Sequence, residues 1–195
     1  MPKKTKTRSR AFYIDTNVAL DYITGRNRQT VLILGKIKDK NWKCISSSFL
    51  AMELADYKKD SLFVIDKAIE KKWEMRKIIR ATDKKDLRRG DFEKVYEWFN
   101  EFRQDYKNIE LYDFLKDADD WQLPQEISFN SNLSAPDAIH LSSAILGALT
   151  SYCQVMITQD ELLTKEGKRI IGEYKLDSKL KIMTIAEVKD KFFKK

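Results

Sequence analysis

A chain of 195 residues is long enough for one domain with a sizeable core and too short for two ordinary domains. Its composition, 43% hydrophobic and 34% charged, is typical of a globular protein and excludes a disordered or fibrous one. No apolar run approaches the roughly 20 residues that a membrane-spanning helix needs, so we expect no membrane partner.

The net charge of +7 is spread unevenly along the chain. Residues 1–10 carry five positive charges and no negative ones, and residues 67–94 hold eleven Lys or Arg against six Asp or Glu. Residues 97–126 reverse this balance and hold three Lys or Arg against nine Asp or Glu. Taken alone, each basic stretch is most often a solvated surface. In combination with a carboxylate metal site, they favour a surface that holds RNA phosphates.

The cysteines and the histidine exclude one class of metal site. Cys44 and Cys153 lie far apart and the chain has a single histidine, which excludes a zinc site of the Cys/His type. The basic N-terminal residues are not followed by an apolar segment long enough for a secretory signal. We therefore expect reduced core thiols and a cytoplasmic protein.

In chain order, short apolar runs first alternate with amphipathic segments. After a basic flexible arm at residues 1–10, the pattern predicts a strand over 11–14, a short helix ending near Gly25 and a helix over 28–38. A strand over 44–46 follows, and then a helix that is capped by Ser47 or Ser48 and runs to about Lys59. Two long amphipathic helices are predicted over 61–80 and 91–105, followed by an irregular stretch over 121–132. We interpret residues 60–130 as a mostly helical insertion.

The alternation resumes in the last third of the chain. The pattern predicts a helix from Ser134 to about 149, a strand over 155–158, a helix to about Tyr174, a strand over 180–185 and a helix over 187–193. Strands that alternate with helices predict an α/β fold, a three-layer α/β/α sandwich with a mostly parallel central sheet. The expected organisation is one domain over 11–195 that carries the helical insertion.

Two aspartates directly follow predicted strands. Asp15 ends the first apolar run and Asp160 follows the strand over 155–158. The carboxyl ends of parallel strands are where ligands bind in α/β sheets. Each aspartate could equally be a helix N-cap, and Thr158 with Glu161 has the spacing of a capping box.

Two further acids continue the apolar faces of predicted helices. Glu53 has Phe49 and Tyr57 as helical neighbours, and Asp137 precedes Leu141 by one turn. Burying such a carboxylate is costly without a partner, either a basic side chain or a metal ion. If four acids converge, cations must neutralise them, and oxygen ligands with open positions suit Mg²⁺ or Mn²⁺.

Four stretches of the sequence resemble the PIN-domain nucleases. They are Tyr13–Val18 (YIDTNV), Ile45–Ser48 with Ala51–Leu54 (ISSS and AMEL), Ala135–Leu141 (APDAIHL) and Ile157–Asp160 (ITQD). They occur in the expected order and in the expected strand or helix context, and the match covers most of the chain outside residues 60–130.

The resemblance implies a PIN-like fold, Mg²⁺ or Mn²⁺ as cofactor, and an endoribonuclease that hydrolyses single-stranded RNA. It further implies four catalytic metal ligands and two polar residues that orient them: Asp15, Glu53, Asp137 and Asp160, with Asn17 and Thr158. Compact members of the family look like VapC-like toxins of toxin–antitoxin pairs, which implies an antitoxin-type inhibitor and a homodimer. The long segment from Glu53 to Asp137 departs from that compact pattern.

Several alternatives stay open at this stage. An inactive PIN-like RNA-binding or scaffold protein would share the fold. A phosphatase of the haloacid-dehalogenase type needs a second aspartate where this chain has Asn17, so we consider it the weakest alternative. His140 is expected to be packed and hydrogen-bonded rather than a general base, and Asp21 is expected to face solvent.

Overall fold

The computed structural model describes residues 10–105 and 109–194. The chain divides into two compact units, Met1–Phe49 with Asn108–Lys195, and Leu50–Lys107. Of the expected basic arm, only Arg10 falls among the described residues. No helix in the described part of the chain combines the length and apolar character needed to cross a membrane.

The first unit is built on a five-stranded, entirely parallel sheet with the order β3-β2-β1-β4-β5. The strands are β1 (Ala11–Ile14), β2 (Lys43–Ser47), β3 (Ile109–Tyr112), β4 (Val155–Ile157) and β5 (Lys181–Met183). The central strand β1 is buried along its whole length, as its uninterrupted apolar run requires when helices cover both faces. The expected α/β architecture with a parallel sheet is therefore confirmed.

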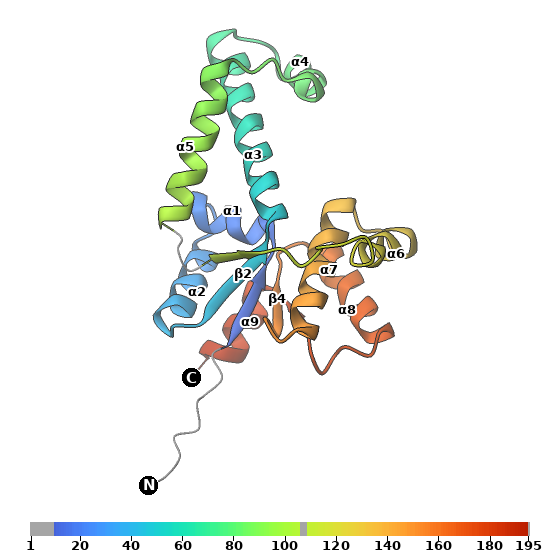
Figure 1. Ribbon diagram of the computed structural model, residues 1–195. Coiled ribbons are helices and arrows are strands. Elements are labelled where there is room, and N and C mark those ends of the chain that lie inside the picture. Colours follow the sequence, from blue (N-terminus) through green and yellow to red (C-terminus); the bar gives the residue numbers. More distant parts are fainter. Residues whose placement is uncertain (1–9, 106–108, 195) are drawn as a thin grey trace. The chain divides into compact units, whose positions relative to one another are not determined.

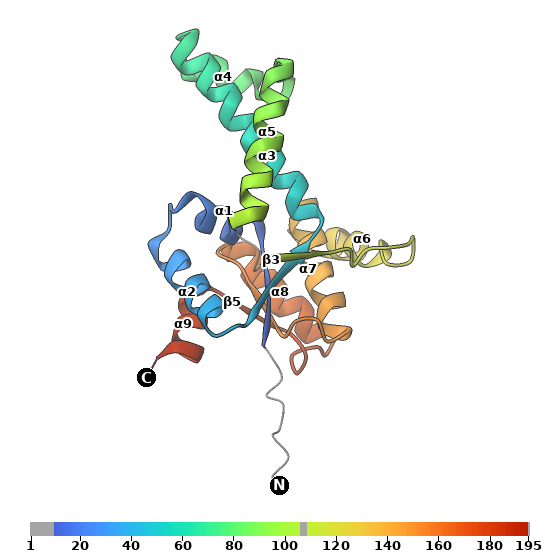
Figure 2. The same cartoon turned by 60° about the vertical axis from the view of Figure 1, so that its left-hand side comes forward.

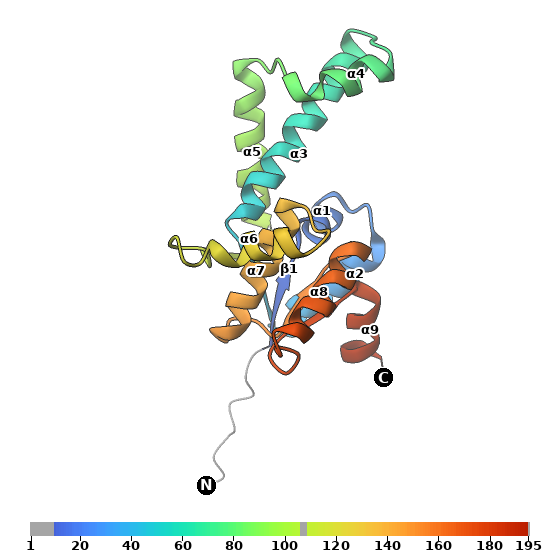
Figure 3. The same cartoon turned by 90° about the vertical axis from the view of Figure 1, so that its right-hand side faces the viewer.

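Helices cover the two faces of this sheet (Figures 1, 2 and 3). On one face lie α1 (Thr16–Thr24), α2 (Arg28–Asp39) and α9 (Ile185–Phe193). On the other lie α6 (Gln122–Asn130), α7 (Ala135–Leu149) and α8 (Glu161–Glu173). Side chains alternate along β1 accordingly, since Tyr13 belongs to the core under α7 and α8 while Phe12 packs on Phe192 of α9.

The second unit is helical. It contains most of α3 (Phe49–Ile65), a π-helical turn at Asp66–Glu70, α4 (Met75–Ala81), a 3-10 turn at Thr82–Lys84 and α5 (Arg89–Asp105). Lys67 is only 1% exposed, and its ammonium nitrogen lies 2.8 Å from Asp66 Oδ2 and 2.6 Å from Asp86 Oδ1. These two carboxylates raise the pKa of Lys67 and stabilise its buried charge.

The structure differs from the sequence prediction in three places, all within residues 60–130. The helix expected to end near Lys59 continues to Ile65, and residues 66–84 break into short turns around α4 instead of one long helix. Residues 109–112 form the edge strand β3. Residues 122–130, expected to be irregular, form α6, whose Pro124 lies in the first turn, where no intrahelical hydrogen bond is lost.

Two helical glycines provide a test of the packing between α8 and β5. A methyl group added at Gly167 would lie 2.4 Å from Cδ1 of Ile182, whereas one at Gly35 in α2 would meet nothing within 4 Å. We expect Gly167→Ala to lower the free energy of unfolding by about 1 kcal/mol, because overpacking outweighs the gain in helix propensity. The matched change Gly35→Ala should raise it by about 0.5 kcal/mol. Urea denaturation distinguishes them, and equal stabilisation by both changes would contradict the packing described.

Candidate active site

The strand order of the sheet reverses between β1 and β4. From β1 it passes to β2 and β3 on one side, and it returns to β4 and β5 on the other. Connections that leave two neighbouring strands in opposite directions open a crevice at the carboxyl ends of those strands. Asp15 and the segment 158–160 follow β1 and β4 at this point.

Asp15 is fixed by both its backbone and its carboxylate. Its backbone N–H donates to the carbonyl of Ile157, with an N–O distance of 3.1 Å, which joins the ends of β1 and β4. Its side chain is the N-cap of α1, because Oδ1 accepts from the backbone N–H of Thr16 at 2.6 Å. The residue is only 3% exposed, so its carboxylate depends on these partners.

Thr158 connects Asp15 to the start of α8. Its hydroxyl donates to Asp15 Oδ2 at 2.8 Å and accepts from the backbone N–H of Asp160 at 3.0 Å. Asn17 supports the same segment, since its Oδ1 accepts from the backbone N–H of Gln159 at 3.2 Å and its Nδ2 lies 3.5 Å from the Thr158 hydroxyl. The two polar residues singled out in the sequence thus contact Asp15 or its neighbours directly.

Asp160 is itself the N-cap of α8. Its Oδ1 accepts from the backbone N–H of Leu163 at 2.7 Å. The capping box expected from Thr158 and Glu161 is wrong, because Thr158 bonds to Asp15 instead. Only one oxygen of Asp160 is used by the cap, so the carboxylate keeps a second oxygen for other partners.

Asp137 lies in the first turn of α7 and is half-buried. Ser134 caps this helix: its hydroxyl accepts from the backbone N–H of Asp137 at 3.3 Å and lies 2.6 Å from Asp137 Oδ2, to which it donates. Ser134 was expected to start the helix, and this is confirmed.

The pKa of Asp15 is raised above its ordinary value. Burial is the largest cause, and the negative charge of Asp137 acts in the same direction. His140 and the hydrogen bonds from Thr158 and Thr16 oppose this rise. A cation bound at Asp15 would offset the cost of burying this carboxylate.

His140 is 1% exposed and held through both ring nitrogens. Nδ1 lies 2.7 Å from the Tyr13 hydroxyl and Nε2 lies 3.0 Å from the Thr16 hydroxyl, while Asp15 Oδ1 is 3.9 Å from Nε2. The ring of Phe49 packs edge-on against the imidazole. The expectation of a packed, hydrogen-bonded histidine is confirmed.

Two further acids, Glu53 and Asp21, lie on α3 and α1. Glu53 lies on α3 in the second unit and is half-buried; its membership of the site stays a prediction. Asp21 is 6% exposed and forms an ion pair with Arg26, so the expectation that it faces solvent is wrong. The exposed guanidinium of Arg26 and the hydroxyl of Thr30, which lies 3.4 Å from Asp21 Oδ2, account for this acid without any ligand.

Ser47 is a site residue that the sequence analysis missed. It lies at the carboxyl end of β2, two residues past the pairing of Tyr13 with Ile45, at the level of Asp15 on the neighbouring strand. Its hydroxyl is buried and finds no hydrogen-bond partner in the described part of the chain. Such a group needs water or a ligand to satisfy it. The run ISSS indicated polarity here, but only the strand register shows which serine is unpaired.

The chemistry of these side chains fits a hard divalent cation. The possible ligands in this part of the chain are carboxylate and hydroxyl oxygens, which Mg²⁺ and Mn²⁺ prefer. Among residues 10–105 and 109–194, no three or more His, Cys, Asp or Glu side chains are gathered closely enough to hold a metal ion by themselves. Mg²⁺ commonly binds through one or two carboxylates, with water and substrate phosphate completing its shell, so Asp15 and Asp137 can provide the protein ligands.

Comparisons with known proteins provide little further information. No protein-family model matches the sequence, and no curated protein matches it. Among solved structures, the chain is similar to the crystal structure of VapBC2 from Rickettsia felis bound to a DNA fragment from their promoter. The identity is 14%, the TM-score is 0.48, and the match covers 89% of this chain and 98% of that chain. A likeness of this degree says nothing about activity or partners.

The hydroxyl of Thr158 provides a test of how the site is held together. Thr158→Val keeps the shape of the side chain but removes the donor to Asp15 and the acceptor for the Asp160 N–H. We expect it to lower the free energy of unfolding by about 1–3 kcal/mol, because buried polar groups lose their partners. Thr158→Ser keeps the hydroxyl and should cost about 1 kcal/mol or less for one lost methyl group. Equal stability of the two variants in urea would contradict this role.

Proposed function

We propose that the protein is a divalent-metal-dependent endoribonuclease that hydrolyses phosphodiester bonds of single-stranded RNA. The observation that carries the proposal is the buried carboxylate of Asp15, which lies at the switch point of the sheet and accepts hydrogen bonds from Thr158 and from the N-terminus of α1. The four motifs that resemble PIN-domain nucleases support it independently of the geometry.

In this proposal Asp15 and Asp137 hold Mg²⁺ or Mn²⁺, with Asp160 and Glu53 as further ligands. When bound, the ion would supply charge neutralisation and activation of water for hydrolysis. Asn17 and Thr158 orient the acids, and Thr158 keeps one oxygen of Asp15 in place by donating to it. A carboxylate held in this way does not need to reorganise when a ligand arrives.

Helix ends support the binding of a phosphodiester. Asp15 and Asp160 cap the N-termini of α1 and α8, and Asp137 lies in the first turn of α7. Helix N-termini carry partial positive charge and offer unpaired N–H groups, which stabilise both carboxylates and phosphates. His140 packs beneath the site and does not serve as general base, since both of its nitrogens are engaged.

The wider biological setting rests on the resemblance alone. It includes a role as the toxin of a toxin–antitoxin pair, inhibition by an antitoxin-type protein and homodimer formation. A cytoplasmic location is inferred instead from the two lone cysteines of the sequence. A second candidate function is an inactive PIN-like RNA-binding or scaffold protein. One observation favours it: no ready-made group of three metal-binding side chains exists among the described residues.

Cleavage of mixed single-stranded RNA with and without Mn²⁺ or Mg²⁺ tests the proposal. We expect activity with either ion and none with EDTA. Asp15→Asn and Asp137→Asn should each lower the rate by more than about 100-fold, since residues that merely orient a metal ligand already contribute about 10–100-fold. The control Glu161→Gln removes an exposed carboxylate next to Asp160 and should keep nearly full activity.

A titration with Mn²⁺ separates the two candidate functions. Binding that is lost in Asp15→Asn, together with cleavage, supports the nuclease. Absence of both binding and cleavage in the unmutated protein would overturn it in favour of the scaffold protein. Equal cleavage by the unmutated protein and Asp15→Asn would show that the activity belongs elsewhere in the chain or to a contaminant.

A further inference from the structure

A cluster of unpaired cations lies at the amino ends of the strands, the edge of the sheet opposite to Asp15. Arg10 precedes β1, Lys181 begins β5, and β4 pairs with both of these strands. With Lys179, and with Lys191 of α9, they line a hollow of about 250 Å³ whose floor includes Phe192. No aspartate or glutamate lines this hollow.

These four cations differ from Lys168 and Lys194 of the same unit, which form ion pairs. Lys168 pairs with Glu187 and Lys194 pairs with Asp190, each at 2.9 Å. Within the described part of the chain, none of the four forms an ion pair with a carboxylate, and all are exposed. These four basic side chains are therefore available to bind anions from outside the chain.

Arg10 is held in place by aromatic rings. Its guanidinium carbon lies 5.1 Å from the centroid of Trp42 and 4.8 Å from that of Phe192, and these two rings contact each other. A guanidinium stacked on aromatic faces keeps its N–H groups directed outward for bidentate contact with a phosphate.

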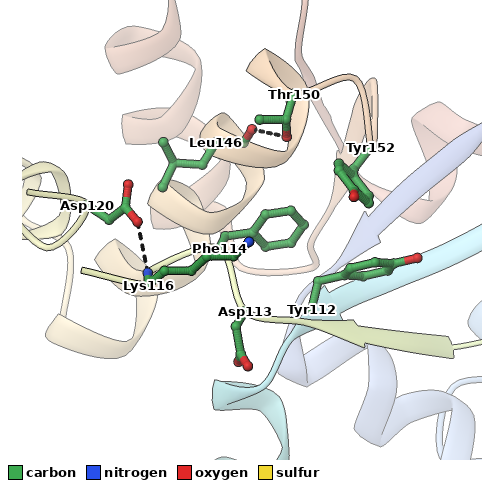
Figure 4. A pocket seen from close by; sticks show the side chains of 8 residues that line it. All are labelled: Tyr112, Asp113, Phe114, Lys116, Asp120, Leu146, Thr150 and Tyr152. Carbon is green, nitrogen blue, oxygen red and sulfur yellow. Dashed lines mark hydrogen bonds between the residues drawn. The ribbon is translucent and has the colours of Figure 1, made fainter.

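Two further hollows adjoin this basic one. The second, of about 270 Å³, shares Ala11 and Gln154 with it and is also lined by Tyr112 and Tyr152. The third, of about 240 Å³, shares Tyr112 and Tyr152 with the second and adds Phe114 (Figure 4). Each hollow is smaller than a typical cofactor pocket of about 300–1,000 Å³. A linear polymer of small repeated units fits a row of small hollows better than a single large ligand does.

The far end of the row presents an aromatic cluster. The ring of Tyr152 is 4.9 Å from that of Tyr112 and 5.9 Å from that of Phe114, and the residue is 48% exposed (Figure 4). Ser151, with a φ of 65°, forms the left-handed turn that precedes it. Phe114 anchors the cluster on Tyr13 in the core. Tyr152 is therefore an exposed ring on a rigid base, as base stacking requires.

Charge falls along the row. The basic hollow holds four cations, whereas Lys43 in the second is paired with Glu110 at 2.8 Å. In the third, Lys116 is accompanied by two aspartates, one of which, Asp120, accepts from the backbone N–H of Lys116. Contacts to phosphates are therefore expected mainly at the Arg10 end of the row, and base stacking mainly at the Tyr152 end.

We infer that this row of hollows, from Arg10 to Tyr152, is a second binding site for single-stranded nucleic acid, separate from the acids. Unpaired cations beside exposed aromatic rings are the combination with which proteins hold single strands, because every unpaired base offers a face for stacking. A duplex hides those faces and would not use Tyr152. The inference does not rest on the proposed hydrolysis, because binding here needs neither metal nor cleavage.

The test measures binding of a fluorescein-labelled oligouridylate by anisotropy over a range of salt concentrations. All proteins are full-length and carry Asp15→Asn, which protects the probe from any cleavage. The double change Lys179→Gln with Lys181→Gln should lower the salt slope by roughly 0.7 for each lost phosphate contact. Tyr152→Leu should weaken binding about tenfold and leave the slope unchanged.

A matched pair of charges in the second unit is the control. Arg76 and Arg80 are exposed on α4, so Arg76→Gln with Arg80→Gln removes the same charge elsewhere and should leave affinity and slope unchanged. The inference is overturned if this control lowers the slope as much as the Lys179 and Lys181 changes, or if those changes have no effect. Equal affinity for a duplex of the same length also overturns it. Thermal melting verifies that each variant is folded.

Discussion

The hydrogen bond from the Thr158 hydroxyl to the Asp15 carboxylate is the contact on which the site depends. A carboxylate that is 3% exposed would be too costly without compensation, and Thr158 and the N-terminus of α1 provide it. The same hydroxyl receives the N–H of Asp160 and so sets where α8 begins. One threonine therefore joins the ends of β1 and β4 and positions two of the four acids.

Much of the fold follows from hydrophobic periodicity, and the exceptions have physical causes. Buried central strands such as β1 and β4 consist of uninterrupted apolar residues, which makes them visible in the sequence. The edge strand β3 was not predicted because its residues are half-buried and do not form an apolar run. It includes Glu110, whose ion-pair partner Lys43 lies far away in the sequence. The helix α6 was not predicted because its stretch combines Pro124 with Asn130, Ser131 and Asn132, a pattern typical of irregular structure, although Pro124 stands in the first turn.

The local structure around the candidate site residues was predictable where the neighbouring sequence alone determines it. Asp15 and Asp160 end apolar runs, and both are strand-end caps as expected. The sequence could not show which distant residues form hydrogen bonds, such as Thr158 with Asp15 and His140 with Tyr13, because these contacts depend on strand register and helix placement. For the same reason it could not show that the Ser47 hydroxyl has no partner among the described residues. Asp21 was misjudged because its pairing with Arg26 depends on the bend after α1.

A crystal of the unmutated protein soaked with Mn²⁺ tests the central claim most directly, because anomalous scattering locates the ion without any assay of activity. We predict an ion bound by carboxylate oxygens of both Asp15 and Asp137, at roughly 2.0–2.2 Å. Whether Glu53 and Asp160 also coordinate it would be visible in the same map. No ion at these two residues under saturating Mn²⁺, or an ion held by other side chains alone, would contradict the claim.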